Sequence, residues 1–338
     1  MSLTPTHPVP IPHGRVFAGI RATSDQHIGN YLGAINNFVD LQERFDCIYS
    51  VVDLHSLTTL TDTDALADNV HETALILLAA GIDPARTILY VQSHVPEISE
   101  LHLLLSMVVP NGWLMRVPTF KEKAREQPDN VNYGLVGYPV LQTADIVMYK
   151  ATHVPIGKDQ LPHLELAREI VRRFNQHFGQ TFPEPQPELT NAPLILGLDG
   201  QRKMSKSLDN HIPIAASDQD TAKRIRSAVT DPQRARRTDP GRPDVCNVYS
   251  LHEFFDPEKR PWIYEQCTTA GIGCVDCKGL LSDAVNDRFR SLRARRDELA
   301  AKPDDVRAIL ADGADRAQAI AKDVLLEVQQ RMGLPPQR

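Results

Sequence analysis

The chain lacks several features that would assign it to common classes of protein. No stretch reaches 18 consecutive apolar residues, so no membrane-spanning helix is expected. The formal net charge is −6, which argues against a strongly basic protein that binds nucleic acid without specificity. No internal repeat is present, and the beginning lacks the charged and then apolar pattern of a secretory signal. We therefore expect a cytoplasmic globular protein, in which any nucleic-acid partner would be bound by local basic patches.

Periodicity divides the remaining chain into three parts. Residues 1–14 contain four prolines and are expected to form a disordered tail. Residues 15–210 alternate short apolar runs with helical stretches, which predicts an α/β domain with a parallel sheet covered by helices. Residues 211–338 show helical periodicity without strand alternation and predict an all-α domain. Residues 109–132 are richer in Pro, Gly and charge, and we interpret them as an insertion.

Individual elements follow from the same patterns. The predicted strands are Val16–Ile20, Cys47–Val52, Thr87–Val91, Ile146–Tyr149 and Val154–Ile156. The predicted helices are Ala65–Ala80, Glu97–Val109, Asp218–Val229, Val248–Phe255, Lys278–Ala300 and Asp304–Met332.

Two short segments favour the binding of a polyphosphate. The lysine loop, residues 203–207 with the sequence Lys-Met-Ser-Lys-Ser, follows a Gly-rich approach and presents two flexible cations. The second segment, His27-Ile28-Gly29-Asn30, opens a helix that follows a buried strand. A glycine there allows close approach to the backbone, and a helix N-terminus favours anions. Each segment alone is more often structural, but together and in this order they predict a nucleotide site.

The pair is typical of class I aminoacyl-tRNA synthetases, and further blocks resemble the tryptophanyl-tRNA synthetases. These blocks are Tyr49–Thr58, Tyr138–Ile146, Val154–Leu166 and Ala228–Asp231. The resemblance runs from about Arg15 to the end of the chain. It implies a Rossmann-type catalytic domain followed by a helical anticodon-binding domain, and a homodimer in which the insertion contributes to the interface. It also implies attachment of L-tryptophan to tRNA(Trp) with ATP and Mg²⁺, through a tryptophanyl-adenylate.

The resemblance assigns roles to individual residues. Lys203, Lys206, His27 and Asn30 would act in catalysis, and Gly29, Met204, Ser205, Lys121 and Lys123 would help to bind ATP. Asp145 would accept the indole N–H of tryptophan, since it follows an apolar helix face; a surface or capping acid is the alternative. Residues that match the rest of the amino-acid pocket are Phe17, Val52, His55, Tyr138, Gln142, Val154, Ile156, Asp159 and Gln160. Tyr138 and Gln160 would hold the α-ammonium and carboxylate, and Asp159 either the ammonium or the ATP ribose. His55 could equally be a core histidine, and Gln142 stands where many relatives carry methionine.

Four of the five cysteines predict a metal site. Cys267, Cys274 and Cys277 lie within eleven positions, and Cys246 lies upstream of them. Disulfides are disfavoured in a cytoplasmic protein, and four thiolates suit either Zn²⁺ or a [4Fe–4S] cluster. The segment Cys267–Cys274 resembles a subset of tryptophanyl-tRNA synthetases with an iron–sulfur cluster, so we expect the cluster, with a structural role.

Three features leave alternatives open. The turn Arg21–Gln26 lacks the Pro and Gly that relatives usually carry, which is the one feature favouring an RNA-binding paralogue that has lost charging activity. A tyrosine-specific synthetase or a nucleotidyltransferase would share the fold, although a small transferase has no use for the helical C-terminal half. Two Arg-rich segments, residues 234–237 and 288–296, are equally compatible with RNA contact and with a solvated face when judged by charge alone.

Overall fold

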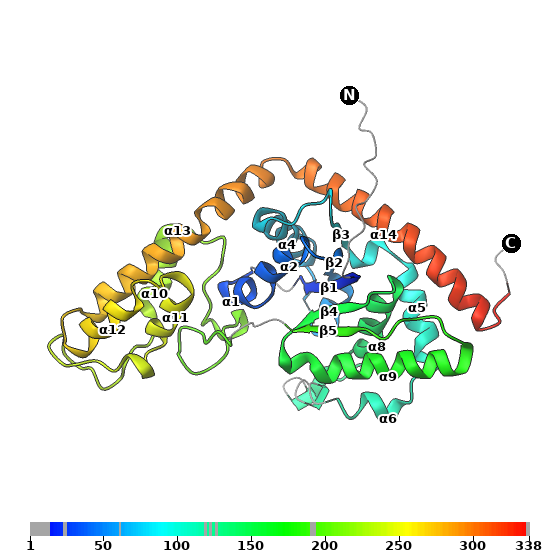
Figure 1. The fold of residues 1–338 in the computed structure, drawn as a ribbon, viewed down its shortest axis with the longest axis horizontal. Coiled ribbons are helices and arrows are strands. Elements are labelled where there is room, and N and C mark those ends of the chain that lie inside the picture. Colours follow the sequence, from blue (N-terminus) through cyan, green and yellow to red (C-terminus); the bar gives the residue numbers. More distant parts are fainter. Residues whose placement is uncertain are drawn as a thin grey trace. The chain divides into compact units, whose positions relative to one another are not determined.

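The computed structural model describes residues 14–22, 26–60, 62–117, 120–121, 124–125, 128–189 and 194–335. The expected tail, residues 1–14, lies outside this part of the chain except for Gly14. Two compact units are present: the first contains residues up to 23, 37–191 and 302–338, and the second contains 24–36 and 192–301. Figure 1 traces both units along the chain.

The first unit is built on a parallel sheet of five strands in the order β3-β2-β1-β4-β5. The strands are β1 (Arg15–Arg21), β2 (Asp46–Val52), β3 (Ile88–Val91), β4 (His153–Ile156) and β5 (Gln186–Leu189). β2 and β3 are almost entirely buried, as expected for strands covered on both faces. The strand order reverses between β1 and β4, and ligands of open α/β sheets bind at the carboxyl ends of the strands near such a point.

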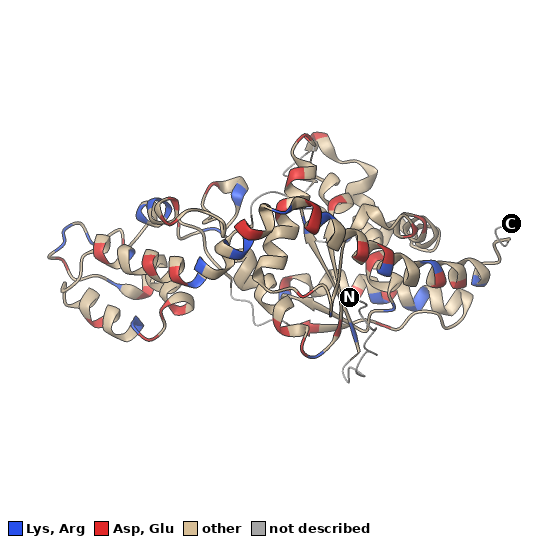
Figure 2. Ribbon diagram, turned by 90° about the horizontal axis from the view of Figure 1, so that it is seen from above, with Lys and Arg blue, Asp and Glu red and all other residues tan. Residues whose placement is uncertain are grey.

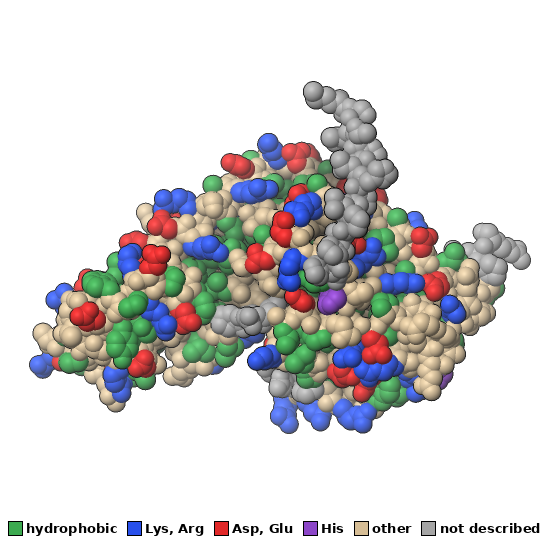
Figure 3. Space-filling model, in the orientation of Figure 1, with side chains coloured by type: hydrophobic (Ala, Val, Ile, Leu, Met, Phe, Trp, Pro, Cys, Tyr) green, Lys and Arg blue, Asp and Glu red, His purple; other side chains and the backbone are tan. Residues whose placement is uncertain are grey.

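Helices of the first unit cover this sheet. They are α2 (Asn36–Leu41), α3 (Asp53–Leu57), α4 (Leu66–Ala80), α5 (Glu97–Ser106), α6 (Asn111–Leu114), α8 (Tyr133–Met148), α9 (Leu161–Phe178) and α14 (Pro303–Arg331). The apolar side of α9 is buried in the core, while Figure 3 shows charges of both signs gathered over its outer side. There Glu165 and Glu184 pair with Arg168 and Arg172 at 2.9–3.5 Å.

The second unit is helical. It begins with α1 (Ile28–Asn30) and a π-helical turn (Tyr31–Ile35) and continues with α10 (Asp218–Ser227), α11 (Asn247–Phe255), α12 (Arg260–Thr268) and α13 (Cys274–Ala300). Helices α10 and α11 pack on α13, and α12 packs on α11 (Figure 1). The predicted fold class, a parallel-sheet α/β domain followed by a helical region, is confirmed.

Several elements differ from the sequence predictions, including helices α3, α6 and α9, which were not predicted. The predicted strand Ile146–Tyr149 is wrong, because Ile146 to Met148 form the last turn of α8. Such a short apolar run has no periodicity that separates a strand from a buried helix, and α8 is buried over most of its length. Strand β5 was not predicted because Pro187 disfavours a strand, although a proline is tolerated at a sheet edge. Helix α12 was also not predicted.

The two units do not follow the predicted boundary at residues 210 and 211. Helix α14 belongs with the sheet, because its small residues Gly313, Ala314 and Ala317 let it lie against β3. A Cβ built on Gly313 would overlap the backbone oxygen of Leu89. Polar contacts add to this packing, including Lys150 Nζ to Glu327 Oε2 at 2.7 Å.

Charge is distributed evenly over the molecule. Figure 2 shows Lys and Arg interspersed with Asp and Glu along the helices of both units. Among the described residues, no helix combines the length and apolar character needed to cross a membrane.

Candidate active site

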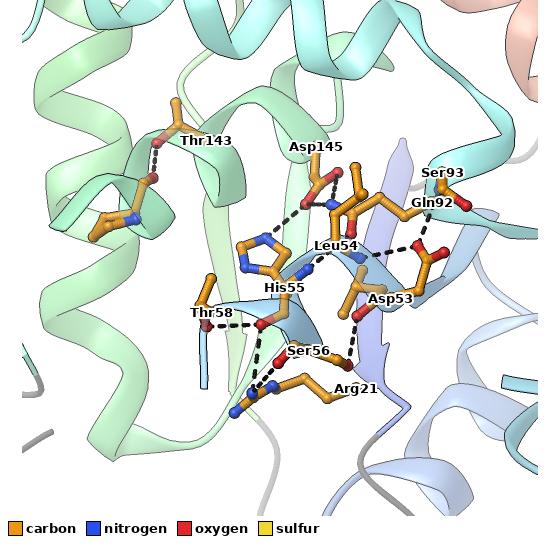
Figure 4. Close-up of polar contacts among 12 residues, drawn as sticks. Arg21, Asp53, Leu54, His55, Ser56, Thr58, Gln92, Ser93, Thr143 and Asp145 are labelled. Atoms are coloured by element: carbon orange, nitrogen blue, oxygen red, sulfur yellow. Dashed lines mark hydrogen bonds and ion pairs between the residues drawn. The ribbon is translucent and has the colours of Figure 1, made fainter. Parts of the chain in front are cut away.

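A buried carboxylate lies at the carboxyl edge of the sheet. Asp145, on α8, is 1% exposed and accepts hydrogen bonds from two side chains that follow neighbouring strands (Figure 4). His55, just after β2, places Nε2 3.0 Å from Oδ2 of Asp145. Gln92, just after β3, donates from Nε2 to both carboxylate oxygens, at 2.9 and 2.8 Å. The sheet therefore brings two residues, His55 and Gln92, onto the carboxylate of a third that is distant in sequence.

Gln92 was missed by the sequence predictions. It is fully buried, and its Oε1 accepts the backbone N–H of His55 at 3.3 Å, so it bridges His55 and Asp145. Asp53 ties the same two strand ends together, because its Oδ1 accepts the backbone N–H groups of Leu54 and Ser93, each at 3.0 Å (Figure 4). The sequence feature that could have identified Gln92 is its position as a polar residue directly after the buried parallel strand Ile88–Val91.

Arg21, the last residue of β1, supports the segment that carries His55. Its Nη2 donates to the backbone oxygens of His55 and Ser56, at 3.4 and 3.5 Å, near the C-terminal end of α3 (Figure 4). A cation at a helix C-terminus is favourable. Burial lowers the pKa of the Arg21 guanidinium from its usual value. Of the turn that departs from the family pattern, Thr23 to Asp25 lie outside the described residues.

The predicted apolar wall is buried in the first unit. Phe17 stacks on Tyr149 with 5.8 Å between ring centroids, and the hydroxyl of Tyr149 donates to that of Tyr90 at 2.8 Å. Val52, Val154 and Ile156 are each at most 8% exposed, while Gln142 is half-buried. A Cβ on Gly19 would approach Cγ1 of Val52 to 2.8 Å, so a glycine in β1 is needed for this packing.

The residues expected to bind the α-ammonium and carboxylate lie on α8 and after β4. Tyr138 is buried, with its ring centroid 5.7 Å from that of His163. Gln160 is half-buried and donates from Nε2 to Oδ2 of the exposed Asp159 at 3.1 Å. His102, which was not predicted, has a pKa lowered by burial and by the nearby charge of His55.

In the second unit, the two predicted phosphate-binding segments lie against each other. The backbone N–H of Ile28 donates to the oxygen of Ile212 at 3.0 Å, just beyond the lysine loop. A Cβ built on Gly29 would lie 3.4 Å from Cβ of Met204, which is 2% exposed. The lysine loop and the start of α1 are therefore neighbours.

His27 caps α1. The ring Nδ1 of His27 accepts the backbone N–H of Asn30 at 3.3 Å, and the backbone N–H of His27 donates to Oδ1 of Asn30 at 3.0 Å. Burial, and then the charges of His211 and Lys203, lower the pKa of His27 to about 4. The ring is thus neutral at physiological pH, and an Nδ1 that accepts leaves the proton on Nε2, ready to donate.

The side chain of Asn210 holds the middle of the lysine loop and links it to Asp199. The N–H of Ser205 donates to Oδ1 of Asn210 at 2.8 Å, and Nδ2 of Asn210 donates to Oδ2 of Asp199 at 2.9 Å. Lys203 and Lys206 themselves are exposed. Lys121, in the first unit, is also exposed, while Lys123 lies outside the described residues.

Comparison with known proteins decides between the families that share this fold. Residues 12–290 match the family model described as tRNA synthetases class I (W and Y). The tryptophan–tRNA ligase of Deinococcus radiodurans is 45% identical over 325 residues, covering 94% of this chain and 98% of the relative. The tryptophan–tRNA ligase of Thermotoga maritima is 42% identical, and the match covers 95% of this chain and 99% of the relative. The crystal structure of tryptophanyl-tRNA synthetase from Campylobacter jejuni complexed with ADP and tryptophan is 34% identical, with a TM-score of 0.87, covering 95% and 100%.

The chain belongs to the class I tryptophanyl-tRNA synthetases. In this synthetase fold, the predicted tryptophan-binding residues lie in the first unit, and His27, Gly29, Asn30 and the lysine loop lie in the second. Contacts within these sets join His55 to Asp145, Gln160 to Asp159, and the start of α1 to the lysine loop.

The synthetase also gathers its four predicted metal-ligating cysteines in the second unit. Cys246 precedes α11, Cys267 lies in α12, and Cys274 and Cys277 lie in the first turn of α13; all are reduced. Burial, and then the charges of the other three thiols, raise the pKa of Cys277 to about 12. Nη1 of Arg234 lies 3.7 Å from the Cys267 sulfur and 4.0 Å from that of Cys274. Across the described residues, no group of three or more His, Cys, Asp or Glu side chains is arranged to hold a metal ion.

The Arg-rich segments of the synthetase are only partly available to a ligand. Arg293, in α13, has a side chain only 12% exposed, and it pairs with Asp218 at 2.8 Å and donates to the backbone oxygen of Ile214 at 2.9 Å. Arg234 faces the cysteines. Arg236 and Arg237 are exposed.

Proposed function

We propose that this synthetase attaches L-tryptophan to tRNA(Trp) with ATP, through a tryptophanyl-adenylate, releasing pyrophosphate and then AMP. The observation that carries the proposal is the contact between the lysine loop and the start of α1, made by the Ile28–Ile212 hydrogen bond and by Met204 against Gly29. These are the segments in which the sequence predicts phosphate binding. The match to tryptophan–tRNA ligases over almost the whole chain supports the amino acid and the tRNA.

In the first step, the tryptophan carboxylate attacks the α-phosphorus of ATP, which enters as its Mg²⁺ complex. The nucleophile is already an anion, so no general base is needed, and the rate depends on positioning and on stabilisation of charge. Lys203 and Lys206 would stabilise the charge that develops on pyrophosphate. His27 and Asn30 would donate to the phosphates without adding a charge, which agrees with the lowered pKa of His27. Gly29, Met204 and Ser205 would shape this site, with Lys121 or Lys123 as a further cation.

Asp145 would select tryptophan. An ionised carboxylate has about four acceptor positions, and three are used by Gln92 and His55. The remaining position suits the indole N–H, the one polar group of the tryptophan side chain. Phenylalanine has no donor to offer and would leave this buried acceptor unpaired.

The rest of the pocket would hold the body of the amino acid. Phe17, Val52, Val154, Ile156 and Gln142 would surround the indole ring. Tyr138 and Gln160 would hold the α-ammonium and carboxylate. Asp159 would assist with the ammonium or with the ATP ribose.

Cys246, Cys267, Cys274 and Cys277 would hold a [4Fe–4S] cluster with a structural role. All four thiols are reduced, and three of them lie close enough to Cys277 to contribute, after burial, to its raised pKa, so the four form a suitable donor set. A zinc ion holds its thiolates at about 2.3 Å and needs them close together, whereas a cluster binds each thiolate to a different iron. Zinc is the alternative, and the resemblance of the segment Cys267–Cys274 to the iron–sulfur subset favours the cluster.

This cluster has a direct test. Protein purified without oxygen should contain about four irons and four acid-labile sulfides per chain. Replacement of Cys277 by serine should remove both. A colourless preparation with one zinc per chain would reject the cluster.

Two partners are proposed on surface features. Exposed Arg236 and Arg237 beside the cysteines would contact tRNA, since phosphate contacts rely on such cations.

A second copy of the chain would cover the apolar surface formed by Leu103, Met107 and Tyr133, which are 53%, 68% and 67% exposed. Helix α5 and the start of α8 meet there, with 6.5 Å between the rings of His102 and Tyr133. With its tRNA substrate and reduced thiols, the enzyme would work in the cytoplasm.

The decisive experiment is exchange of labelled pyrophosphate into ATP. Exchange should require tryptophan and should not proceed with tyrosine, and the purified chain should then charge tRNA(Trp). Exchange with tyrosine, or binding of tRNA without any exchange, would overturn the proposed function.

The proposed dimer has its own test. Replacement of Met107 by glutamate should convert a dimer into monomers in analytical ultracentrifugation.

A further inference from the structure

The root of the lysine loop is a short ladder of backbone hydrogen bonds. Gly197 N–H donates to the oxygen of Arg202 at 2.8 Å, and Met204 N–H donates to the oxygen of Ile195 at 2.9 Å. The chain reverses at Gly200, whose φ of +68° is unfavourable for other residues. This ladder sets the direction in which the loop leaves the unit.

Gly197 is held between two asparagines. On one side, a Cβ built on Gly197 would lie 2.2 Å from Cγ of Asn210, so a side chain does not fit. On the other side, the Gly197 oxygen accepts a hydrogen bond from Nδ2 of Asn247 at 2.8 Å. Asn247 is 7% exposed, and its Cβ lies 3.4 Å from the position of a Cβ on Gly200. Asn247 therefore lies against the turn that starts the loop, with its amide on Gly197 and its Cβ beside Gly200.

Asn247 comes from a different part of the unit. It is the first residue of α11 and follows Cys246 directly. A second connection runs beside it: the N–H of Val229 donates to the oxygen of Leu198 at 2.8 Å. The root of the lysine loop is thus attached to the segment that contains the first cysteine.

We propose that Asn247 is a positioning residue for the lysine loop. Its amide holds the Gly197 carbonyl, and so fixes the orientation in which Lys203 and Lys206 reach the nucleotide. Since Asn247 is buried, it would act through the loop and not on the substrates directly. The proposal rests on the proposed function, because it assumes that the lysines stabilise pyrophosphate. A consequence is that a change in the packing around Cys246 would shift Asn247 and so alter the orientation of the lysine loop.

The test compares Asn247→Asp with a matched control. Aspartate keeps the shape of asparagine but cannot donate to the carbonyl, and an acid at the start of α11 favours the helix, so the variant should fold. The control is Asn286→Asp. Asn286 is also 7% exposed, lies in the same unit, and donates from Nδ2 to a backbone oxygen, that of Asp218 at 3.3 Å, away from the lysine loop.

Two measurements separate positioning from general stability. In tryptophan-dependent pyrophosphate exchange, Asn247→Asp should lower kcat/KM for ATP about 5- to 100-fold, as expected when a buried carbonyl loses its partner, and leave KM for tryptophan within about twofold. Tryptic cleavage after Arg202, Lys203 or Lys206 should accelerate by a similar factor. Asn286→Asp should change neither value by more than about twofold, because the partners of Asn286, the Asp218 oxygen and Arg293, lie outside the lysine loop.

Either of two results would overturn the proposal: equal effects of both variants on ATP kinetics, or unchanged tryptic cleavage in Asn247→Asp. Failure of the proposed function would look different. Wild-type protein would then show no exchange, while the difference in cleavage between the two variants would remain.

Discussion

Replacement of Gln92 by leucine tests the pocket most sharply. Leucine has a similar size but removes both N–H contacts to Asp145 and the acceptor for the N–H of His55. A hydrogen bond to a charged group contributes about 1.5–3 kcal/mol, which corresponds to roughly 10- to 150-fold in an equilibrium constant. With its carboxylate no longer oriented, the enzyme should bind tryptophan less well. We expect kcat/KM for tryptophan in pyrophosphate exchange to fall by this factor, mainly through KM.

A second glutamine provides the matched control. Gln42 is 6% exposed in the same unit, donates to the backbone oxygens of Val39 and Gly81, each at 3.2 Å, and has no contact with Asp145. Gln42→Leu should lower the free energy of unfolding in urea by about 1–3 kcal/mol, as Gln92→Leu should, without altering KM for tryptophan. If Gln92→Leu loses stability but keeps the wild-type KM, the reasoning about orientation is refuted.

Three further outcomes follow from local packing and charge. Gly313→Ala should lower the free energy of unfolding by about 1–3 kcal/mol in urea denaturation, because its Cβ would overlap the backbone of Leu89. Gly279→Ala should raise the free energy of unfolding by about 0.5–1 kcal/mol, because a Cβ at this position on α13 would have no atom within 4 Å. A loss of stability in this variant would contradict that reasoning. The pKa of His27, about 4 against a usual 6.5, means that the unfolded chain binds more protons between these values. Stability should therefore decline as pH falls from 6.5 to 4, and an NMR titration of His27 with a midpoint near 6.5 would disprove this.

Strong local patterns were sufficient for most elements. The runs Val16–Ile20 and Cys47–Val52 form β1 and β2 with at most one residue added at each end, because buried parallel strands are continuously apolar. Ile146–Tyr149 has the same apolar character but continues α8, since its preceding residues already form a helix that is buried on nearly all sides. A four-residue run does not contain the information that separates these cases.

The functional site likewise contains residues that short motifs predict and one residue, Gln92, that they do not. The positions of His27, Asn30 and the lysine loop could be read from short motifs, because glycine-opened helices and flexible cations have a direct chemical reason to bind phosphate. Gln92 belongs to no such motif. It matters only because β2 and β3 are neighbours in the sheet and their carboxyl ends place it beside His55 and Asp145.

By itself, the sequence determined the α/β class and the family, and it predicted the residues with phosphate-binding and thiolate chemistry, since each depends on residue type at short spacing. Only the tertiary structure decided that α14 packs on β3, that Gln92 orients Asp145, and that Asn247 holds the root of the lysine loop. The physical reason is that each of these contacts joins residues at least fifty positions apart. Such contacts have no period and no local composition from which they could be inferred before the chain is folded.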